Sequence, residues 1–330
     1  MMRFLATYHI RIALLALAAT LVAGTSMPAL ASAEGSFQRT LQVSGPVNLD
    51  VSTGSGNIRV RPGGSAQVEV IGRIKVTNWF GRDAEDRVRR IEANPPIQQS
   101  GNNIRIGHID DPELRRNISI SYELTVPAET ELHSHSGSGN QIIEGIHGTV
   151  EVEAGSGNLK ISDIGSKVRA EAGSGDIQIE HVKGNVHTKA GSGSIRATDI
   201  AGGFEAHTGS GHISLEQTAP GSVSADSGSG GMDLRGVHGT LEATAGSGDI
   251  RAEGEPTGGW TVRTGSGTVQ LKLAPGAAFD LNARTSSGSL SVAQPVTVQG
   301  SMGRKEIHGK VNGGGVPVHV ETGSGSIEIE

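Results

Sequence analysis

Cysteine is absent from the 330 residues of this sequence, and aromatic residues make up only 3% of it. A chain without cysteine forms no disulfide bonds, and it offers no cysteine on which a lipid anchor could be built. The formal net charge is −6, and the sequence contains neither a basic stripe nor an aromatic platform, which nucleic-acid binding requires. We therefore expect no nucleic-acid partner.

Long apolar runs are also missing, except near the N-terminus. There, Arg3 and Arg11 precede an apolar run over residues 12–23, which is followed by Ala31-Ser32-Ala33. This is the layout of a secretory signal peptide, and the run is too short to span a bilayer comfortably. We predict that residues 1–33 are a signal peptide cleaved after Ala33; the alternative is an uncleaved membrane anchor. The mature chain would be soluble, without a membrane span and with net charge −8, in the periplasm, at the cell surface or secreted.

Glycine, in contrast, is abundant, with 50 residues, and much of it recurs in one phrase. The phrase Gly-Ser-Gly-x-apolar-x-apolar returns at intervals of 18 or 19 residues, starting at Gly137, Gly155, Gly173, Gly191, Gly209, Gly228, Gly246 and Gly265. A fixed short period of this kind is typical of a solenoid, in which each repeat is one coil stacked on the last.

Apolar residues alternate with polar ones inside each repeat, which is the period of a β-strand. With the first glycine as position 0, large apolar residues take positions 4, 6, 9 and 13, and small residues take 15 and 17. In the second repeat these are Leu159, Ile161, Ile164, Val168, Ala170 and Ala172. We predict an all-β fold, a single-chain β-solenoid (β-helix) with coils of about 18 residues. Its core is too narrow for an internal cavity, so ligands must bind outside, and the corner glycines are expected to supply positive φ angles.

The regular repeats cover only part of the chain. Residues 41–60 already contain one coil, and an interruption then holds one helix near Asp83–Ala93, stopped by Asn94-Pro95-Pro96. The interruption also holds three strand-like pieces, at 67–76, 103–109 and 117–126. The predicted organisation is therefore a signal peptide (1–33), an N-terminal coil with an enlarged strand and helix module that caps the solenoid (34–136), the regular solenoid (137–288) and degenerate C-terminal coils (289–330). Outward Glu328 and Glu330 in the last strand are expected to discourage end-to-end stacking.

Three features of this layout resemble a known family. They are Pro127 after a strand, the return into serial Ser-Gly-x-Ile coils, and the closing Gly323-Ser324-Gly325-Ser326-Ile327. Together they are similar to the bacterial "putative adhesin" family, a domain of unknown function with Ser-Gly-rich repeats in exported or envelope proteins. The resemblance covers residues 37–330. It implies an exported, adhesin-like module, and it brings no catalytic residue, because the family has none established.

Outward positions 14 and 16 place polar side chains in rows along successive coils. His133, His135, Glu151 and Glu153 are the candidates for a surface metal site, because neighbouring strands bring their nitrogen and oxygen donors together, and Zn²⁺ accepts both. The alternative, which we favour, is a ladder of solvated ion pairs such as Glu151 with Arg169 and Glu171 with Lys189, each of them weak. We accordingly assign no metal and no cofactor.

Corner position 3 carries a second polar row: Asn140, Asn158, Asp176, Ser194, His212 and Asp249. Aspartate beside glycine-rich corners is typical of calcium-binding nonapeptide rolls, which need it in nearly every repeat. Only two of these six residues are aspartate. We therefore predict polar stacking that satisfies the backbone of the turns.

No cluster of acid, base and nucleophile is visible in the sequence, and the serines recur with the period, which indicates a structural role. The dinucleotide-binding fingerprint requires a helix after its glycines, whereas Gly-x-Gly here precedes strands, so the fingerprint is not present. We predict a non-enzymatic binding or structural module of the cell envelope, whose partner is an envelope or surface protein or a glycan. The alternatives are a periplasmic scaffold or sensory component of an envelope regulatory system, and a carbohydrate-active β-helix enzyme. A pocket with two or more converging carboxylates would favour the enzyme.

Overall fold

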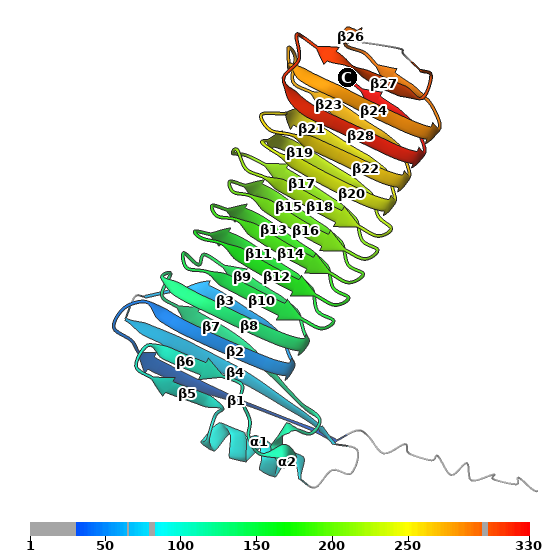
Figure 1. Cartoon of the computed structure of the whole chain (residues 1–330). Helices are drawn as coiled ribbons and strands as arrows, with labels where there is room; N and C mark the ends of the chain where they lie inside the picture. Colours follow the sequence, from blue (N-terminus) through cyan, green and yellow to red (C-terminus); the bar gives the residue numbers. More distant parts are fainter. Residues whose placement is uncertain (1–30, 65, 79–82, 299–302) are drawn as a thin grey trace, which may run out of the picture.

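Each repeat folds into two short strands joined at the Gly-Ser-Gly corner, and successive repeats stack in parallel (Figure 1). The computed structural model describes residues 31–64, 66–78, 83–298 and 303–330. In the regular part, neighbouring strands pair with a shift of one repeat, so that Leu159 lies opposite Ile177 and Val168 opposite Val186. Equivalent positions of successive coils therefore lie side by side. The predicted β-solenoid is confirmed.

The first strand of each coil joins one long sheet and the second strand joins another. Among the described residues, sheet A contains, in spatial order, β1 (Ala31–Gln42), β4 (Gln67–Asn78), β7 (Ile118–Val126), β3 (Ile58–Pro62), β9 (Gln141–Glu144), β11 (Leu159–Ile164), β13 (Ile177–Val182), β15 (Ile195–Ile200), β17 (Ile213–Gln217), β19 (Met232–His238), β21 (Ile250–Glu255), β23 (Val269–Leu273), β29 (Ile327–Ile329) and β25 (Leu290–Val292).

Sheet B contains, in spatial order, β26 (Val296–Val298), β27 (Glu306–Val311), β24 (Phe279–Ser287), β28 (Val316–Ser324), β22 (Trp260–Ser266), β20 (Leu241–Ser247), β18 (Val223–Ser227), β16 (Phe204–Thr208), β14 (Val186–Ala190), β12 (Val168–Ala172), β10 (Val150–Ala154), β8 (Thr130–Ser138), β2 (Val47–Ser55), β6 (Asn103–Ile106) and β5 (Ile97–Ser100). Two helices, α1 (Ala84–Ala93) and α2 (Pro112–Arg115), lie at the end of the solenoid opposite the C-terminus (Figure 1).

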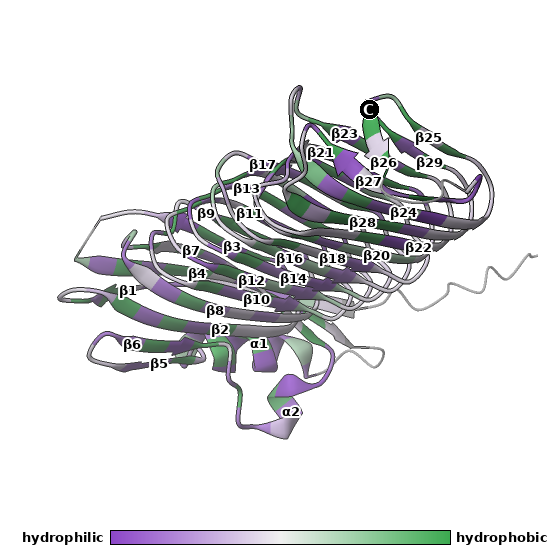
Figure 2. Cartoon of the chain, turned by 45° about the horizontal axis from the view of Figure 1, so that its top comes forward, coloured by the Kyte–Doolittle hydropathy of each residue, from purple (hydrophilic) through white to green (hydrophobic). Residues whose placement is uncertain are grey.

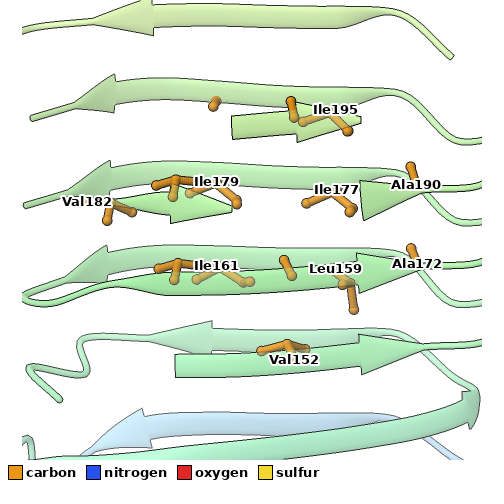
Figure 3. Close-up of a cluster of buried hydrophobic side chains, with 14 of the residues drawn as sticks. Val152, Leu159, Ile161, Ala172, Ile177, Ile179, Val182, Ala190 and Ile195 are labelled. Atoms are coloured by element: carbon orange, nitrogen blue, oxygen red, sulfur yellow. The ribbon is translucent and has the colours of Figure 1, made fainter. Parts of the chain in front are cut away.

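The core is the thin layer between the two sheets. Large side chains of sheet A, such as Ile177 and Ile179, lie with the small Ala172 and Ala190 of sheet B (Figure 3). Hydrophobic and hydrophilic residues alternate along the stacked strands (Figure 2), because every second side chain points outward. The predicted inward positions are buried throughout the regular coils. The layer is thus filled by its own side chains, and each buried Ile or Leu contributes about 1.5–3 kcal/mol.

Two inward positions hold buried glutamines, Gln141 and Gln217, which were not predicted. Gln141 occupies position 4 of the first repeat and is fully buried. Its Nε2 donates to the carbonyl oxygen of Glu153 at 2.6 Å, and its Oε1 accepts from the Ser134 hydroxyl. Because both ends of the carboxamide are bonded, the polar side chain is tolerated in the core.

The corner glycines are needed for close approach rather than for a left-handed backbone. A Cβ on Gly157 would lie far inside van der Waals contact of the Gly139 carbonyl oxygen, one coil away. The second glycine of the corner has a positive φ only in the first and the late coils, at Gly56, Gly248, Gly267, Gly288 and Gly325. The expectation that these glycines supply positive φ is therefore wrong for the central coils, where coils simply stack too closely for a side chain.

The N-terminal module extends both sheets. The coil formed by β2 and β3 stacks on β8 and β9, after which β7, β4 and β1 continue sheet A, and β6 and β5 continue sheet B. The predicted helix is present as α1, which packs Val88 and Ile91 inward and whose Glu92 accepts the backbone N–H of Ser36 in β1 at 2.8 Å. β1, β5 and α2 were not predicted. β1 begins inside the predicted signal peptide, whose residues 1–30 lie outside the described residues.

The C-terminal coils do not stack in chain order. β28 lies between β22 and β24, so that Val318 pairs with Trp260 on one side and with Leu281 on the other. Likewise β29 lies between β23 and β25, and Glu328 is flanked by Gln270 and Ser291. The expectation that Glu328 and Glu330 protect the terminal edge is therefore wrong. Within the described residues, β24 and β25 come first in the sequence and form the outermost coil. The antiparallel pair β26 and β27 follows, and β28 and β29 then lie between that coil and the coil of β22 and β23.

A charge in the core tests the register of the coils. Ile195→Ala is expected to lower the free energy of unfolding by about 2–5 kcal/mol, and Ile195→Asp by more, because an unpaired carboxylate would be buried. Arg196→Asp, one position along and facing outward, is the matched control and should leave thermal unfolding nearly unchanged. Equal effects of the two aspartates would contradict the register.

Deletion of residues 316–330 tests the inserted coil. Without β28 and β29, β24 keeps only its antiparallel partner β27 and β25 loses β29, so the backbone amides of residues 279–292 should exchange faster in hydrogen-exchange measurements. Coils before Gly246 have all their neighbours and should keep their protection. Unchanged protection of residues 279–292 would mean that β24 stacks on β22 directly.

Candidate binding surface on the outer face of sheet B

The outer face of sheet B carries rows of charged side chains along the solenoid. Strand alternation points positions 14 and 16 outward, and the coil register places His133 next to Glu151, Glu151 next to Arg169, and so on. The row at position 14 continues through His187 and Glu205. The rows predicted from the sequence are therefore present.

Neighbours within these rows form ion pairs. Glu151 contacts His133 through an Nδ1–Oε2 distance of 3.0 Å and Arg169 through an Nε–Oε1 distance of 3.5 Å. His187 and Glu205 pair at 3.1 Å. The predicted ladder with its Glu151–Arg169 pair is thus present, whereas Glu171 contacts Arg169 on its own strand instead of Lys189. Because these side chains are about one third to two thirds exposed, each pair stabilises the fold little.

The four candidate metal ligands form two separate pairs. His133 contacts Glu151, and His135 contacts Glu153 at 3.4 Å, in adjacent rows. Across the part of the chain that the structure describes, no group of three or more His, Asp and Glu side chains is arranged to hold a metal ion. The arrangement is that of an ion-pair ladder.

A shallow groove runs beside the charged row at position 14. Its floor is the row at position 12, which is short or lacks a side chain at Thr149, Gly203 and Ser222, and this leaves a hollow of about 590 Å³. A second hollow of about 630 Å³ lies over β2, β6 and β5, and His133 lines both. We call this the sheet B groove, lined by one row of Asp50, His133, Glu151, Arg169, His187 and Glu205 and another of Thr149, Lys167, Asn185, Gly203 and Ser222.

The groove was not predicted, although small residues recurring beside a row of long ones were a signal for it. Two of its carboxylates are far apart. Glu151 and Glu205 lie three coils apart, about 14 Å at the usual strand spacing, and each is paired with a histidine. The converging acid pair that would favour a glycosidase is therefore not formed by these two residues.

The outer face of sheet A is charged in the same manner, at position 7. Lys272 donates to Glu253 at 2.8 Å, and this hydrogen bond lowers the pKa of the Glu253 carboxyl. Arg235 is held by Asp233 on its own strand at 2.6 Å. The hollow of about 620 Å³ beside them is thus bordered by groups already engaged with each other.

The corner row at position 3 bonds the backbone of the next coil. Asn140 Oδ1 accepts the N–H of Asn158 at 3.0 Å, Asn158 Oδ1 accepts that of Asp176 at 2.9 Å, and Asp176 Oδ1 accepts that of Ser194 at 2.8 Å. Asp249 Oδ1 accepts the N–H of Thr268 in the same way. The predicted polar stacking is confirmed, and these oxygens serve the turns.

A further row, at position 8, was missed. Asp163, His181 and Asp199 have φ between 55° and 59°, at the point where other coils have Gly145 and Gly236. His181 lies between the two aspartates, at 3.4 Å from Asp163 and 3.9 Å from Asp199. The signal in the sequence is the exchange of Gly and Asp at one repeat position, which indicates a left-handed residue.

Comparison with known families decides the classification. The model of the family described as Toastrack DUF4097 matches residues 47–330. The chain belongs to this family. The Toastrack chain is also similar to two solved structures: a "putative adhesin" from Bacteroides fragilis with 15% identity, covering 90% of this chain and 97% of that one at a TM-score of 0.35, and a "putative cell adhesion protein" from Clostridium sporogenes with 10% identity, covering 90% and 99% at a TM-score of 0.21. No curated protein matches it.

Among the residues that the structure describes, no helix of the Toastrack chain has the length and apolar character to cross a membrane.

Chelation tests the assignment of the polar rows. Because the position 3 oxygens bond backbone N–H groups and the His–Glu pairs lie apart, the melting temperature of the Toastrack chain should be the same with and without EDTA. Re-addition of Ca²⁺ or Zn²⁺ should likewise leave it unchanged. A drop in melting temperature with EDTA that one of these ions reverses would establish a structural metal.

Proposed function

We propose that this Toastrack chain is a non-enzymatic, adhesin-like binding module of the bacterial cell envelope that acts through the outer faces of its solenoid. The observation that carries the proposal is that the space between the two sheets is filled, whereas the hollows lie on the outer surface. The side chains in this space are buried, and the polar rows under the hollows are exposed.

The repeated surface supports a binding role. The same outward positions return at every coil, so a long partner meets similar groups again and again along the solenoid. Each contact with an exposed charged side chain is weak. Many of them on one rigid scaffold add up, which is the usual way in which extended repeat proteins use their surfaces.

Export is supported by residues 1–33, with their basic start, apolar run and Ala31-Ser32-Ala33. Cleavage after Ala33 would remove three residues of β1, and the remaining strand from Glu34 to Gln42 would still pair with β4. The predicted mature chain thus keeps the edge of sheet A.

A non-enzymatic role is supported by the state of the acidic side chains. Glu151 and Glu205 are engaged by histidines, and Glu253 by Lys272. The lysine lowers the pKa of Glu253 and so disfavours its use as a general acid at neutral pH.

The experiment is to present the purified chain, residues 34–330, to an array of envelope glycans and surface and matrix proteins. Saturable binding to members of one class is the expected result. Charge-reversing changes at exposed residues of one solenoid face should then abolish it, and the same changes on the opposite face should not. If the chain binds no member of the array, an adhesive role is contradicted, and a scaffold or sensory component in the periplasm is favoured.

A further inference from the structure

The sheet B groove is long, and its two hollows meet at His133. It crosses nine consecutive strands, from β5 and β6 over β2 and β8 to β18. At about 4.8 Å between strands, this is a path of roughly 38 Å. The strands that carry the lining residues are stacked along the solenoid (Figure 1). A ligand that fills the groove must be extended and must lie along the axis of the solenoid.

The charges that line the groove nearly cancel, with three basic against four acidic side chains. Its basic side chains are Arg105, Lys167 and Arg169, and its acidic ones are Asp50, Glu131, Glu151 and Glu205. Two of the three basic side chains pair with acidic ones in the lining, Arg105 with Asp50 at 3.4 Å and Arg169 with Glu151 at 3.5 Å. A polyanion or a polycation would meet a repulsive group beside almost every attractive one. The lining therefore fits an uncharged polymer.

The lining offers hydrogen-bond donors and acceptors in turn. Asn185 is held by the N–H of Gly203, which donates to its Oδ1 at 2.9 Å. Arg169, Glu151 and Glu205 are already paired, but a guanidinium has five N–H donors and a carboxylate about four acceptor sites, so each keeps hydrogen-bonding capacity. The amide nitrogen of Asn185 can donate as well. A polymer of hydroxyl groups, each of which both donates and accepts, satisfies such a mixture better than a chain with one kind of group.

Apolar anchors are missing from the groove. Val168, Val186 and Phe204 underlie it, but each is at most 2% exposed. Every aromatic side chain among the residues with described burial is buried. Protein interfaces usually pair aromatic or apolar hot-spot residues on both partners, and the groove exposes no aromatic residue of its own among those with described burial.

The step between coils is close to the length of one sugar ring. Equivalent groups recur once per coil, about 4.8 Å apart. A pyranose residue in an extended chain advances by slightly more than this distance, so each coil would meet about one ring.

We propose that the sheet B groove binds a linear, uncharged polysaccharide laid along the solenoid axis, at about one sugar residue per coil; this inference rests on the proposed binding function. The groups that bind it are the side chains at positions 12 and 14, with Arg169 and Asn185 at the centre. Each coil contributes little, and the affinity comes from chain length.

The test uses residues 34–330 and linear neutral oligosaccharides of glucose and of N-acetylglucosamine, from disaccharides to about eight units, the length that fills the groove at one unit per coil. Isothermal titration calorimetry gives the dissociation constants. We expect at least one of the two series to bind, with an affinity that rises with each added unit up to that length and then levels off. Heparin and polylysine, the charged polymers, should bind weakly or not at all.

Three variants locate the site. Thr149→Lys fills the floor of the groove and Arg169→Ala removes its central donor, and each should weaken binding of the longest oligomer by about tenfold, as the loss of one charged hydrogen bond does. Thr198→Lys makes the same exchange on the outer face of sheet A and should leave binding unchanged. Melting temperatures confirm that each variant is folded; should Thr149→Lys unfold the coil, Arg169→Ala still decides.

Absence of binding by both neutral series would overturn the inference. If a protein or a charged polymer then binds on the array, the binding function stands and only its ligand class is wrong; if nothing binds there either, both fail. Binding without length dependence, or binding that Thr198→Lys weakens and Arg169→Ala does not, would also place the ligand outside the groove.

Discussion

Each coil is held to the next by backbone hydrogen bonds that join equivalent positions of successive repeats. The same spacing governs the corners, where Gly157 approaches the carbonyl of Gly139 too closely for any side chain. Because each residue of a strand pairs with one residue of the next coil, an extra residue in a repeat must be placed in a turn or bulge. The 19-residue step after Gly209 is absorbed in the turn between Gln217 and Val223, because Ile200 pairs with Gln217 and Phe204 with Val223; this turn lies away from the Gly-Ser-Gly corner. The corner itself stays in step, since Gly228 still bonds to Thr208.

This constraint explains why the sequence predicts so much of the fold. The alternation of polar and apolar residues along each strand shows which residues point inward. The repeat of about 18 residues shows which outward residues become neighbours on successive coils. The Glu151–Arg169 pair and the Asn158–Asp176 bond could therefore be predicted from residue numbers alone.

What could not be predicted depends on choices that a local pattern leaves open. The strands at Leu290–Val292 and Ile327–Ile329 follow similar Ser-Gly-Ser corners, and either could pair with β23. In the structure Ile327–Ile329 pairs with β23, and the similar corners give no signal for that choice. The groove was missed for a different reason: it arises from the relative sizes of side chains in two rows, such as Gly203 beside Glu205, and alternation of polar and apolar residues carries no information on size.

The inserted last coil imposes an order on folding. Coils up to β22 and β23 can be added one by one as the chain emerges, because each finds its neighbour already in place. The coil of residues 279–292 cannot dock in its final position until β28 and β29 have arrived between it and β22. The C-terminal end is therefore completed last, when β28 and β29 take their places between the strands on both sides. A chain crossing a membrane N-terminus first would complete its stack only when the last strand has emerged.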